Sequence, residues 1–515
     1  MSAGRAAAVE AELKLAAAPR TIARLAGEPL LGSAEGAAQP LTAIYFDTPR
    51  RSLWRNGYTL RLRRERGRWV QTVKGRGTLE AGLHRRLEDS QDAERPEPSL
   101  DRIGDDELRK QVAGIVREAP LKPVFQVEVT REVRLASPQP DVLIEASLDR
   151  GTIRAGNARA QISEIELELK QGAPWHVFDL ALAVSERYTA RLEHRSKAER
   201  GYALAGAIRP APVRSRFAVS GRGVSVSAAL KEICIACLNH LQANQPGVMR
   251  GGEPEYLHQA RVALRRMHAG LLVFKRMAAR EALEPQIDAV RKFLRSLGPA
   301  RDWDVYAGST LAPVLRQFEG HKGLAALARA TERLREEANG SARRLFASRR
   351  YQRLVLGLGR WLAREPWLED ASARQEGAWQ ADVREHAVLV LERYHRRVRK
   401  TGRDLESAGL KRLHRLRIAT KKLRYAAIFF APLFVRGSAR EMLSALNDLQ
   451  DLLGAINDCA AASALLDESV RAARGPMRTE ARTIVNHWNS SQLEERRREL
   501  PEAWEAFRSA ARFWR

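Results

Sequence analysis

The sequence predicts an α+β protein in which a β-rich N-terminal domain is followed by an all-α helical bundle. Up to about residue 200 the apolar residues recur with a period of two, and beyond a linker they recur with a helical period. The first part carries charged residues at every second position, and the second part contains an internal duplication. At 515 residues the chain is long enough for more than one domain.

Rows of carboxylates mark two expected strands near the two ends of the β-rich part. Residues 9–15 and 162–170 alternate carboxylates with apolar side chains. Because alternate residues of a strand share a face, each segment presents an acidic row on one face and an apolar row on the other. The acidic residues are Glu10, Glu12, Glu164 and Glu166, and Asp149 adds a fifth carboxylate to the pool.

Cations occur between these acidic segments with the same spacing. Arg61 and Arg63 share one face of an expected strand, Lys74 and Arg131 lie on two others, and Lys197 follows in a basic segment. Acidic and basic rows at strand spacing indicate a closed sheet with a charged interior. Arginine matches phosphate oxygens with a planar fork, and a hard divalent ion such as Mg²⁺ bridges carboxylate to phosphate. Salt bridges on an exposed sheet face are the alternative use of the same residues.

Such an interior suits attack of a metal-oriented water on a terminal phosphorus while Arg and Lys hold the leaving phosphate. The sequence contains no Walker-type glycine-rich loop, no HExxH motif and no serine nucleophile elbow. Charge is also uneven along the chain. Residues 1–205 hold 33 Lys and Arg against 29 Asp and Glu, whereas the remainder holds 55 against 33. The cationic second half therefore indicates a polyanionic partner.

The helical half contains two copies of one motif, offset by 156 residues. Each copy begins with a His-x-x-Arg segment and reaches, 44 residues after the His, the Asp of a Leu-Gly-x-x-x-Asp segment. Positions i, i+3, i+7 and i+10 of a helix share one face, so each copy carries a cationic stripe. The stripes are His258, Arg261, Arg265 and His268, then His414, Arg417, Lys421 and Arg424, with Arg266 and Lys422 in matching places. If the copies pack with pseudo-twofold symmetry, the stripes line one groove; a solvated outer face is the alternative. Asp302 and Asp458 are expected either to orient a stripe cation or to cap a helix.

Cysteine usage and hydropathy favour a cytoplasmic protein. Three cysteines form no disulfide framework, and the lone Cys234-x-x-Cys237 pair is expected to be buried in helix packing. No apolar run approaches the length of a membrane span, and the N-terminal residues lack the apolar core of a signal peptide.

Taken together, the motifs of residues 7–205 resemble the CYTH superfamily, the triphosphate tunnel metalloenzymes. Glu10-x-Glu12-x-Lys14 is similar to the family's ExExK signature, and further motifs follow in the family's order. They are Tyr45-Phe46-Asp47-Thr48, the Leu60–Arg63 strand, Thr72-Val73-Lys74-Gly75, Leu148-Asp149, Glu164-x-Glu166 and Ser196-Lys197. The resemblance implies an eight-stranded antiparallel β tunnel. It implies Mg²⁺, or Mn²⁺, held by Glu10, Glu12, Asp149, Glu164 and Glu166. It implies catalytic roles for Glu10, Glu12, Lys14 and Lys74, and phosphate binding by Lys14, Arg61, Arg63, Lys74, Arg131 and Lys197.

After a linker at residues 206–222, the segment 223–515 resembles a CHAD domain, with repeats expected at about 223–370 and 380–515. This resemblance implies binding of inorganic polyphosphate. The residues implied are His258, Arg261, Arg265, Arg266, His414, Arg417, Lys421 and Lys422. The second copy has lysines where the first has Arg265 and Arg266, so charge is kept but bidentate geometry is lost.

The combined resemblance implies a metal-dependent inorganic triphosphatase joined to a polyphosphate-binding domain, cytoplasmic and consistent with a place at polyphosphate granules. One alternative is an organic substrate: thiamine triphosphate, a nucleoside triphosphate, or ATP in a class IV-type adenylate cyclase. Aromatic residues that would serve an organic base are Tyr45, Trp54, Tyr58 and Trp69. Another alternative is a non-catalytic polyphosphate adaptor. Nucleic acid is not an expected partner, since the stripes lack aromatic stacking platforms. A membrane is not expected either, since no apolar run approaches the length of a span.

Overall fold

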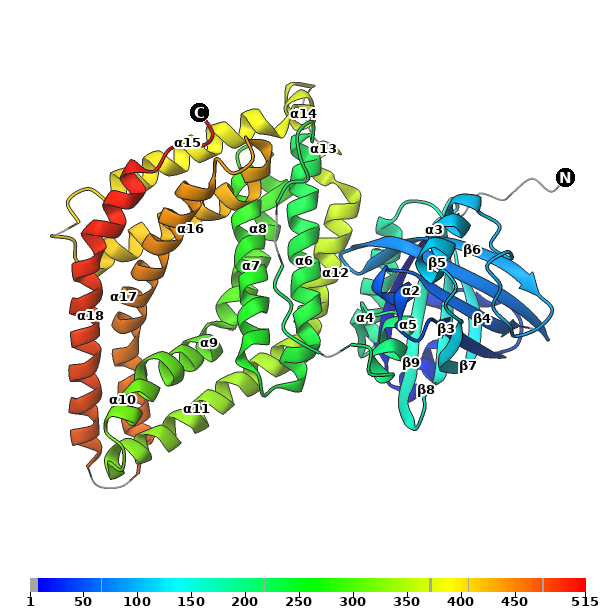
Figure 1. Ribbon diagram of the computed structural model, residues 1–515, viewed down its shortest axis with the longest axis horizontal. Coiled ribbons are helices and arrows are strands. Elements are labelled where there is room, and N and C mark those ends of the chain that lie inside the picture. Colours follow the sequence, from blue (N-terminus) through cyan, green and yellow to red (C-terminus); the bar gives the residue numbers. More distant parts are fainter. Residues whose placement is uncertain are drawn as a thin grey trace. The chain divides into compact units, whose positions relative to one another are not determined.

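The computed structural model describes residues 8–515 except 66, 209, 216–217, 279, 370–372, 406 and 475–476 (Figure 1). The side chains of residues 8–10, 76, 86 and 373–374 are also outside the described part. Contacts divide the chain into two compact units. The first combines Met1–Ala211 with Ala347–Glu365, and the second combines Pro212–Phe346 with Pro366–Arg515. Within the described residues, no helix has the combination of length and apolar character that crossing a membrane requires.

The first unit is built on an antiparallel sheet that closes on itself. Its strands are β1 (Ala8–Ala17), β2 (Ser33–Ala34), β3 (Gln39–Asp47), β4 (Thr59–Glu65), β5 (Arg68–Glu80), β6 (Leu83–Ala93), β7 (Lys122–Ala136), β8 (Leu143–Ala155), β9 (Ala158–Gln171) and β10 (Ala190–Leu192). The strand order is β10-β1-β6-β5-β4-β3-β7-β8-β9, and β9 pairs back onto β1. The closed ring therefore has eight strands, in the order β1, β6, β5, β4, β3, β7, β8 and β9. This confirms the predicted fold class for the N-terminal half.

Strand alternation gives the ring an apolar outer face and a charged interior. Leu13 and Leu15 of β1 are fully buried on the side where helices pack, whereas Lys14 between them points to the opposite side. In the β1–β9 register Lys14 lies directly opposite Glu166. The helices of this unit are α1 (Pro19–Leu25), α2 (Ser52–Arg55), α3 (Asp106–Val116), α4 (Trp175–Arg187), α5 (Lys197–Leu204) and α12 (Arg349–Arg364). Helices α1 and α4 pack on the outer face, so the charged rows line the interior.

Helix α5 covers an apolar part of the same interior face. Its Tyr202 packs against a cluster that includes Tyr45 and Phe125. A Cβ atom on Gly201 would lie 2.1 Å from Phe125 Cε2, so the close approach of α5 to the sheet requires glycine at that position. The first residue of the helix, Lys197, is thereby held among the charged strands.

The second unit is helical throughout its regular elements. These are α6 (Val226–Arg250), α7 (Pro254–Phe274), α8 (Arg280–Ser296), α9 (Gly298–Val305), a π-helical segment (Tyr306–Leu311), α10 (Ala312–Gln317), α11 (Lys322–Ala347), α13 (Pro366–Glu369), α14 (Ala373–Gln380), α15 (Val383–Thr401), α16 (Leu410–Phe430), α17 (Arg440–Ala472) and α18 (Arg478–Ser509). This confirms the all-α C-terminal half. Cys234 and Cys237 are fully buried, and burial raises the pKa of both thiols, as expected for packing residues.

The duplication is visible in the helix bounds. Helices α7 and α16 both have 21 residues, and their first residues, Pro254 and Leu410, are separated by the predicted offset. The copies differ where α8 and α9 of the first copy correspond to the single helix α17. Pro299 lies in the first turn of α9 and cannot donate a backbone hydrogen bond to continue α8, whereas Ala455 holds the matching place inside α17. Pro299 thus lies at the point where the helix of the first copy is interrupted.

Candidate functional site

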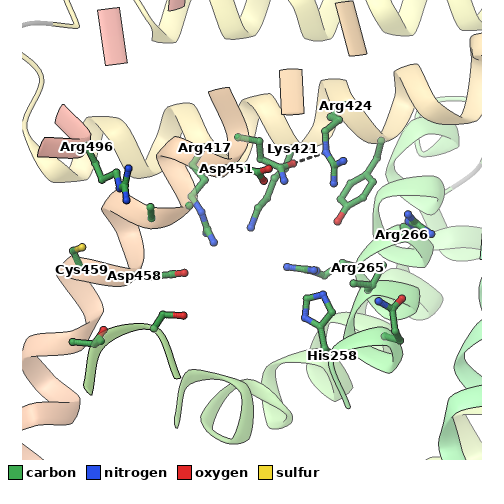
Figure 2. Close-up of a pocket in the computed structure, with 18 of the residues that line it drawn as sticks. His258, Arg265, Arg266, Arg417, Lys421, Arg424, Asp451, Asp458, Cys459 and Arg496 are labelled. Carbon is green, nitrogen blue, oxygen red and sulfur yellow. Dashed lines mark hydrogen bonds between the residues drawn. The ribbon is translucent and has the colours of Figure 1, made fainter. Parts of the chain in front are cut away.

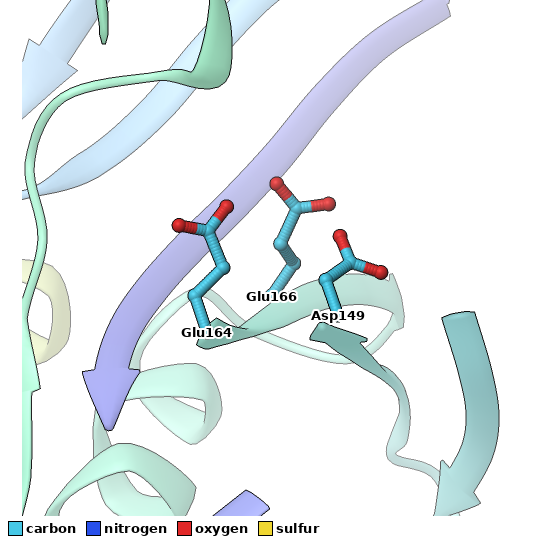
Figure 3. A group of neighbouring side chains, drawn as sticks. All are labelled: Asp149, Glu164 and Glu166. Carbon is cyan, nitrogen blue, oxygen red and sulfur yellow. The ribbon is translucent and has the colours of Figure 1, made fainter. Parts of the chain in front are cut away.

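Three carboxylates from neighbouring strands meet on the interior face of the closed sheet. Asp149 of β8 lies opposite Glu164 of β9, and Glu166 follows two residues further along the same face. Oxygen atoms of the three side chains lie within 4.8 Å of one another (Figure 3). Asp149 and Glu164 are fully buried. We call these three residues the acidic cluster.

Lys197 and Arg131 each contact more than one carboxylate of the acidic cluster. Lys197 Nζ lies 2.6 Å from Asp149 Oδ2, 2.6 Å from Glu164 Oε1 and 2.9 Å from Glu166 Oε1. Arg131 donates to both oxygens of Asp149, at 2.7 and 2.6 Å, and to Glu166 Oε2 at 2.5 Å. The family resemblance assigns these two cations to phosphate. In this structure they neutralise the carboxylates that the resemblance assigns to metal.

The ExExK segment of β1 joins the same cluster. Lys14 is 2% exposed; its Nζ lies 3.1 Å from Glu166 Oε1 and also pairs with Glu12. The backbone of Glu10 pairs with Arg86 of β6, but its side chain is outside the described part. The structure therefore brings Glu12 and Lys14 to the acidic cluster and leaves the side chain of Glu10 undetermined.

Burial opposes charge throughout the cluster, yet the ion pairs outweigh it. For Glu166 burial favours the neutral acid, but Lys14, Lys197 and Arg131 hold its pKa well below the usual range. The pKa of Asp149 is also lowered, because Lys197 and Arg131 outweigh its burial. The pKa values of Lys14 and Lys197 are raised in turn, since the facing carboxylates outweigh burial of the ammonium groups. These groups are therefore all charged at neutral pH.

A basic group lies on the opposite side of the ring, on β4 and β5. In the ring order β5 is opposite β8, and β4 is opposite β9. Arg61 Nη2 lies 3.7 Å and Lys74 Nζ 3.1 Å from the carboxylate of Glu88. Arg63 pairs with Glu65, and burial together with the neighbouring Arg61 lowers the pKa of Arg63 to about 10. The interior thus has an acidic side on β8 and β9 and a basic side on β4 and β5, while two of the cations predicted for phosphate, Arg131 and Lys197, lie on the acidic side.

Glu88 and Arg200 are among the charged residues of the interior that sequence reasoning missed. Glu88 lies opposite Lys74 in the β5–β6 register, and the alternation along β6 would have placed it on the interior face. Arg200 Nη1 donates to Glu164 Oε2 at 2.5 Å. It lies three residues after Lys197 on α5, a spacing that puts both on one helix face.

The stripes of the two copies meet in the second unit. Helices α7 and α16 contact each other and, with α17, line a cavity of about 650 Å³, which we call the cationic pocket (Figure 2). In Figure 2 Arg265 points into it from one side, and Arg417 and Lys421 point into it from the other. Five of the predicted polyphosphate residues line the pocket: His258, Arg265, Arg266, Arg417 and Lys421. The remaining lining cations are Arg424 of the second stripe, Arg214 and Arg496.

Three predicted polyphosphate residues lie elsewhere. Arg261 Nη1 donates to Leu294 O at 3.3 Å, so its guanidinium joins helix packing. His414 Nδ1 lies 2.7 Å from Asn457 Oδ1, and Lys422 is exposed. Helical spacing alone places a residue on a face but does not say how far along that face the partner helix runs.

The aspartates of the Leu-Gly-x-x-x-Asp segments lie inside helices. Asp302 is within α9 and Asp458 is within α17, so neither caps a helix. Asp458 lines the cationic pocket beside Arg417. The pKa of Arg417 is lowered overall, because the Asp458 carboxylate only partly offsets the effect of burial. Burial raises the pKa of Asp302, and the charge of Arg261 opposes that shift. Of the two predicted roles, the positions favour orientation of a stripe cation.

Burial, together with repulsion between neighbouring cations, lowers the pKa of two bases in the cationic pocket. Burial, then Arg417 and Arg265, lower the pKa of Lys421 to about 7. Burial, then Arg301 and Arg265, lower the pKa of His258 to about 4, so this imidazole is neutral at physiological pH. An anion inside the pocket would relieve this repulsion.

Comparison with known proteins agrees with the two units. The model of the CYTH domain matches residues 8–202, and that of the CHAD domain matches residues 232–467. An inorganic triphosphatase of Haemophilus influenzae is 31% identical over 166 residues, which cover 31% of this chain and 44% of that protein. An uncharacterized protein of Mycobacterium tuberculosis is 28% identical over 453 residues, or 80% of either chain. The CHAD domain of Ricinus communis is 30% identical with a TM-score of 0.50, covering 59% of this chain and 98% of that one.

A closed antiparallel sheet with a charged interior and a duplicated helical domain define a two-domain protein with one polar site in each part. The chain belongs to the proteins in which a CYTH domain is followed by a CHAD domain.

Proposed function

We propose that the first unit hydrolyses inorganic triphosphate with a divalent metal ion and that the second unit binds inorganic polyphosphate. The observation that carries the proposal is the division of one enclosed interior into the acidic cluster on β8 and β9 and the basic side on β4 and β5. A substrate with four or five negative charges needs the basic side, and a metal ion needs the acidic cluster. The Haemophilus influenzae relative supports a triphosphatase of this kind.

The acidic cluster fits a hard divalent cation. Its three carboxylates supply oxygen ligands only, within reach of one ion, and Glu12 is linked to them through Lys14. Lys197 contacts all three carboxylates, so positive charge already lies among them, which supports a cation at this position. An ion bound there would supply charge neutralisation and a lowered pKa for its water.

The chain's own cations would hold the substrate. Arg61, Arg63 and Lys74 lie side by side on β4 and β5, where two planar guanidiniums and one ammonium face the interior. Burial and repulsion from Arg61 lower the pKa of Arg63, so an anion between the two guanidiniums is favoured electrostatically. The carboxylate of Glu88 lies beside both Arg61 and Lys74.

Packing of the aromatic residues favours an inorganic substrate over an organic one. Tyr45 is 4% exposed and stacks on Phe125, and Trp54 stacks on Tyr202 with ring centroids 4.5 Å apart. Tyr58 belongs to the core cluster on the outer face of the sheet, and Trp69 packs against it. These rings already have packing partners, so they are not platforms for a base.

The cationic pocket supports a phosphate polymer as partner of the second unit. Six arginines and one lysine line it, a density that suits closely spaced anionic groups. The pocket also contains two aromatic residues, Tyr425 and Trp488, which the stripes alone did not predict. Arg424 lies over the Tyr425 ring, 5.4 Å from its centroid, and so covers one stacking face. Polyphosphate is therefore favoured over nucleic acid.

Two assays on the full chain test the proposal. Phosphate release is measured from inorganic triphosphate, ATP, thiamine triphosphate and long-chain polyphosphate at equal phosphate concentration. Selective turnover of inorganic triphosphate is expected, and faster turnover of ATP or thiamine triphosphate would refute the substrate assignment. For the second unit, polyphosphate and duplex DNA compete for binding at fixed ionic strength, because salt weakens both alike. Displacement of polyphosphate by DNA at equal phosphate concentration would refute polyphosphate as the preferred partner.

A further inference from the structure

Helix α12 lies within the sequence that the CHAD model matches, yet its contacts belong to the first unit. The chain leaves the second unit after Phe346 and re-enters it at Pro366. The unit that contains the closed sheet is thus made from two segments that lie far apart in the sequence.

α12 packs closely along α4, the helix that covers β1 and β9. A Cβ atom on Gly359 would lie 2.3 Å from Phe178 Cε1, so the two helices approach as only glycine allows. Arg360 pairs with Asp179 beside this contact. Small-residue packing and a matched ion pair are typical of a built interface within one domain.

A buried polar contact continues from α12 into the sheet. Gln352 is 2% exposed, and its Oε1 accepts a hydrogen bond from Leu192 N at 2.8 Å. Leu192 is the last residue of β10, which pairs with β1 and ends the strand order, so this amide lies at a sheet edge. The next residue, Glu193, donates its N–H to Lys14 O at 2.9 Å. An edge amide without a strand partner needs another acceptor, and α12 provides it.

We propose that α12 is a structural part of the catalytic domain and that Gln352 is a positioning residue that acts through β10 on Lys14. The inference deepens the proposed triphosphatase function and rests on it. Its consequence is that the sequence of the CHAD region contributes one helix to the site on which hydrolysis depends. Gln352 touches neither substrate nor metal ligands; it holds the edge strand whose neighbour carries Lys14.

The test uses the full chain with Gln352→Met, which keeps the volume and removes the acceptor, and Gly359→Val, which forces α12 away from Phe178. The matched control is Gln380→Met, the same replacement at an exposed position of α14. Three properties are measured: kcat and KM for inorganic triphosphate, amide hydrogen exchange in peptides covering β10 and β1, and polyphosphate binding.

Gln352→Met is expected to lower kcat by about threefold to tenfold, the size of one lost hydrogen bond, with little change in KM. Gly359→Val displaces the whole helix and is expected to lower kcat at least as much. Exchange at Leu192, Glu193 and the β1 peptide should accelerate, while polyphosphate binding and the control stay at wild-type values. Unchanged kcat in both variants, or a fall in kcat with unchanged exchange at β10, would overturn the inference. If the wild-type protein hydrolyses no triphosphate, the proposed function fails. In that case faster amide exchange at β10 in Gly359→Val than in wild type would still show that α12 supports this strand, and unchanged exchange would show that it does not.

Discussion

The affinity of the cationic pocket for polyphosphate is expected to fall as the pH rises from about 6 to about 8, because of Lys421. Burial, Arg417 and Arg265 lower the pKa of its ammonium to about 7, and Asp458 only partly compensates. In the empty pocket the group is therefore about half protonated near neutral pH. A bound polyanion replaces a repulsive environment with an attractive one, so the pKa of Lys421 rises on binding and a proton is taken up.

The magnitude follows from the two protonation equilibria. With a pKa of about 7 in the free pocket and an ordinary lysine value of about 10 in the complex, linkage gives about a tenfold loss of affinity from pH 6 to pH 8. Solvent screening at a half-buried site reduces this to between about threefold and tenfold. The sign is fixed, because uptake of a proton on binding makes binding weaker as protons become scarcer.

Lys421→Arg is the matched variant, since it gives the second copy the arginine that Arg265 provides in the first. Dissociation constants for polyphosphate of one chain length are measured by calorimetry across this pH range at constant ionic strength. The wild-type slope should disappear in the variant, and its affinity at pH 8 should exceed that of the wild type. His258 does not titrate in this range, because its pKa is about 4. Equal slopes in the two proteins would refute the argument.

Three further predictions concern the first unit. Asp149→Asn removes a buried counter-charge of Arg131 and Lys197 and should lower the free energy of unfolding by about 3–5 kcal/mol. Urea unfolding measures this loss. A loss below about 1 kcal/mol would show that the ion pairs are not coupled to folding. Because the pKa values of Asp149 and Glu166 are lowered on folding, their contribution to stability is complete above about pH 5 and is lost as the pH falls further. Equal urea midpoints at pH 7 and pH 3 would contradict this. Arg63→Gln should raise KM for inorganic triphosphate about tenfold or more through loss of a charged hydrogen bond, and an unchanged KM would remove Arg63 from the substrate site.

Strand alternation was sufficient to predict which charged side chains share a face. Asp149, Glu164 and Glu166 converge because residues two apart on paired strands must point the same way. Alternation does not give the order of strands around a ring, however. It therefore did not predict that Arg131 of β7 and Lys197 of α5 would contact the carboxylates instead of facing the basic side.

The repeat was equally informative about the second unit, and its limits have a physical cause. Equal spacing predicted two stripes on one groove, and α7 and α16 do contact each other. The crossing of the two helices decides which residues reach the groove. The sequence of one helix does not specify where and at what angle the other helix crosses it. The place of α12 was unpredictable for a related reason, since Gly359 has meaning only beside Phe178, a residue far away in sequence.

The most direct test of the central claim is phosphate release from inorganic triphosphate by the full chain, with Mg²⁺ or with EDTA, compared between wild type and Glu12→Gln. The account predicts turnover with Mg²⁺ that EDTA abolishes and that the variant lacks, while both proteins bind polyphosphate equally. Turnover that persists in EDTA or in Glu12→Gln, or no turnover in any condition with polyphosphate still bound, would contradict it.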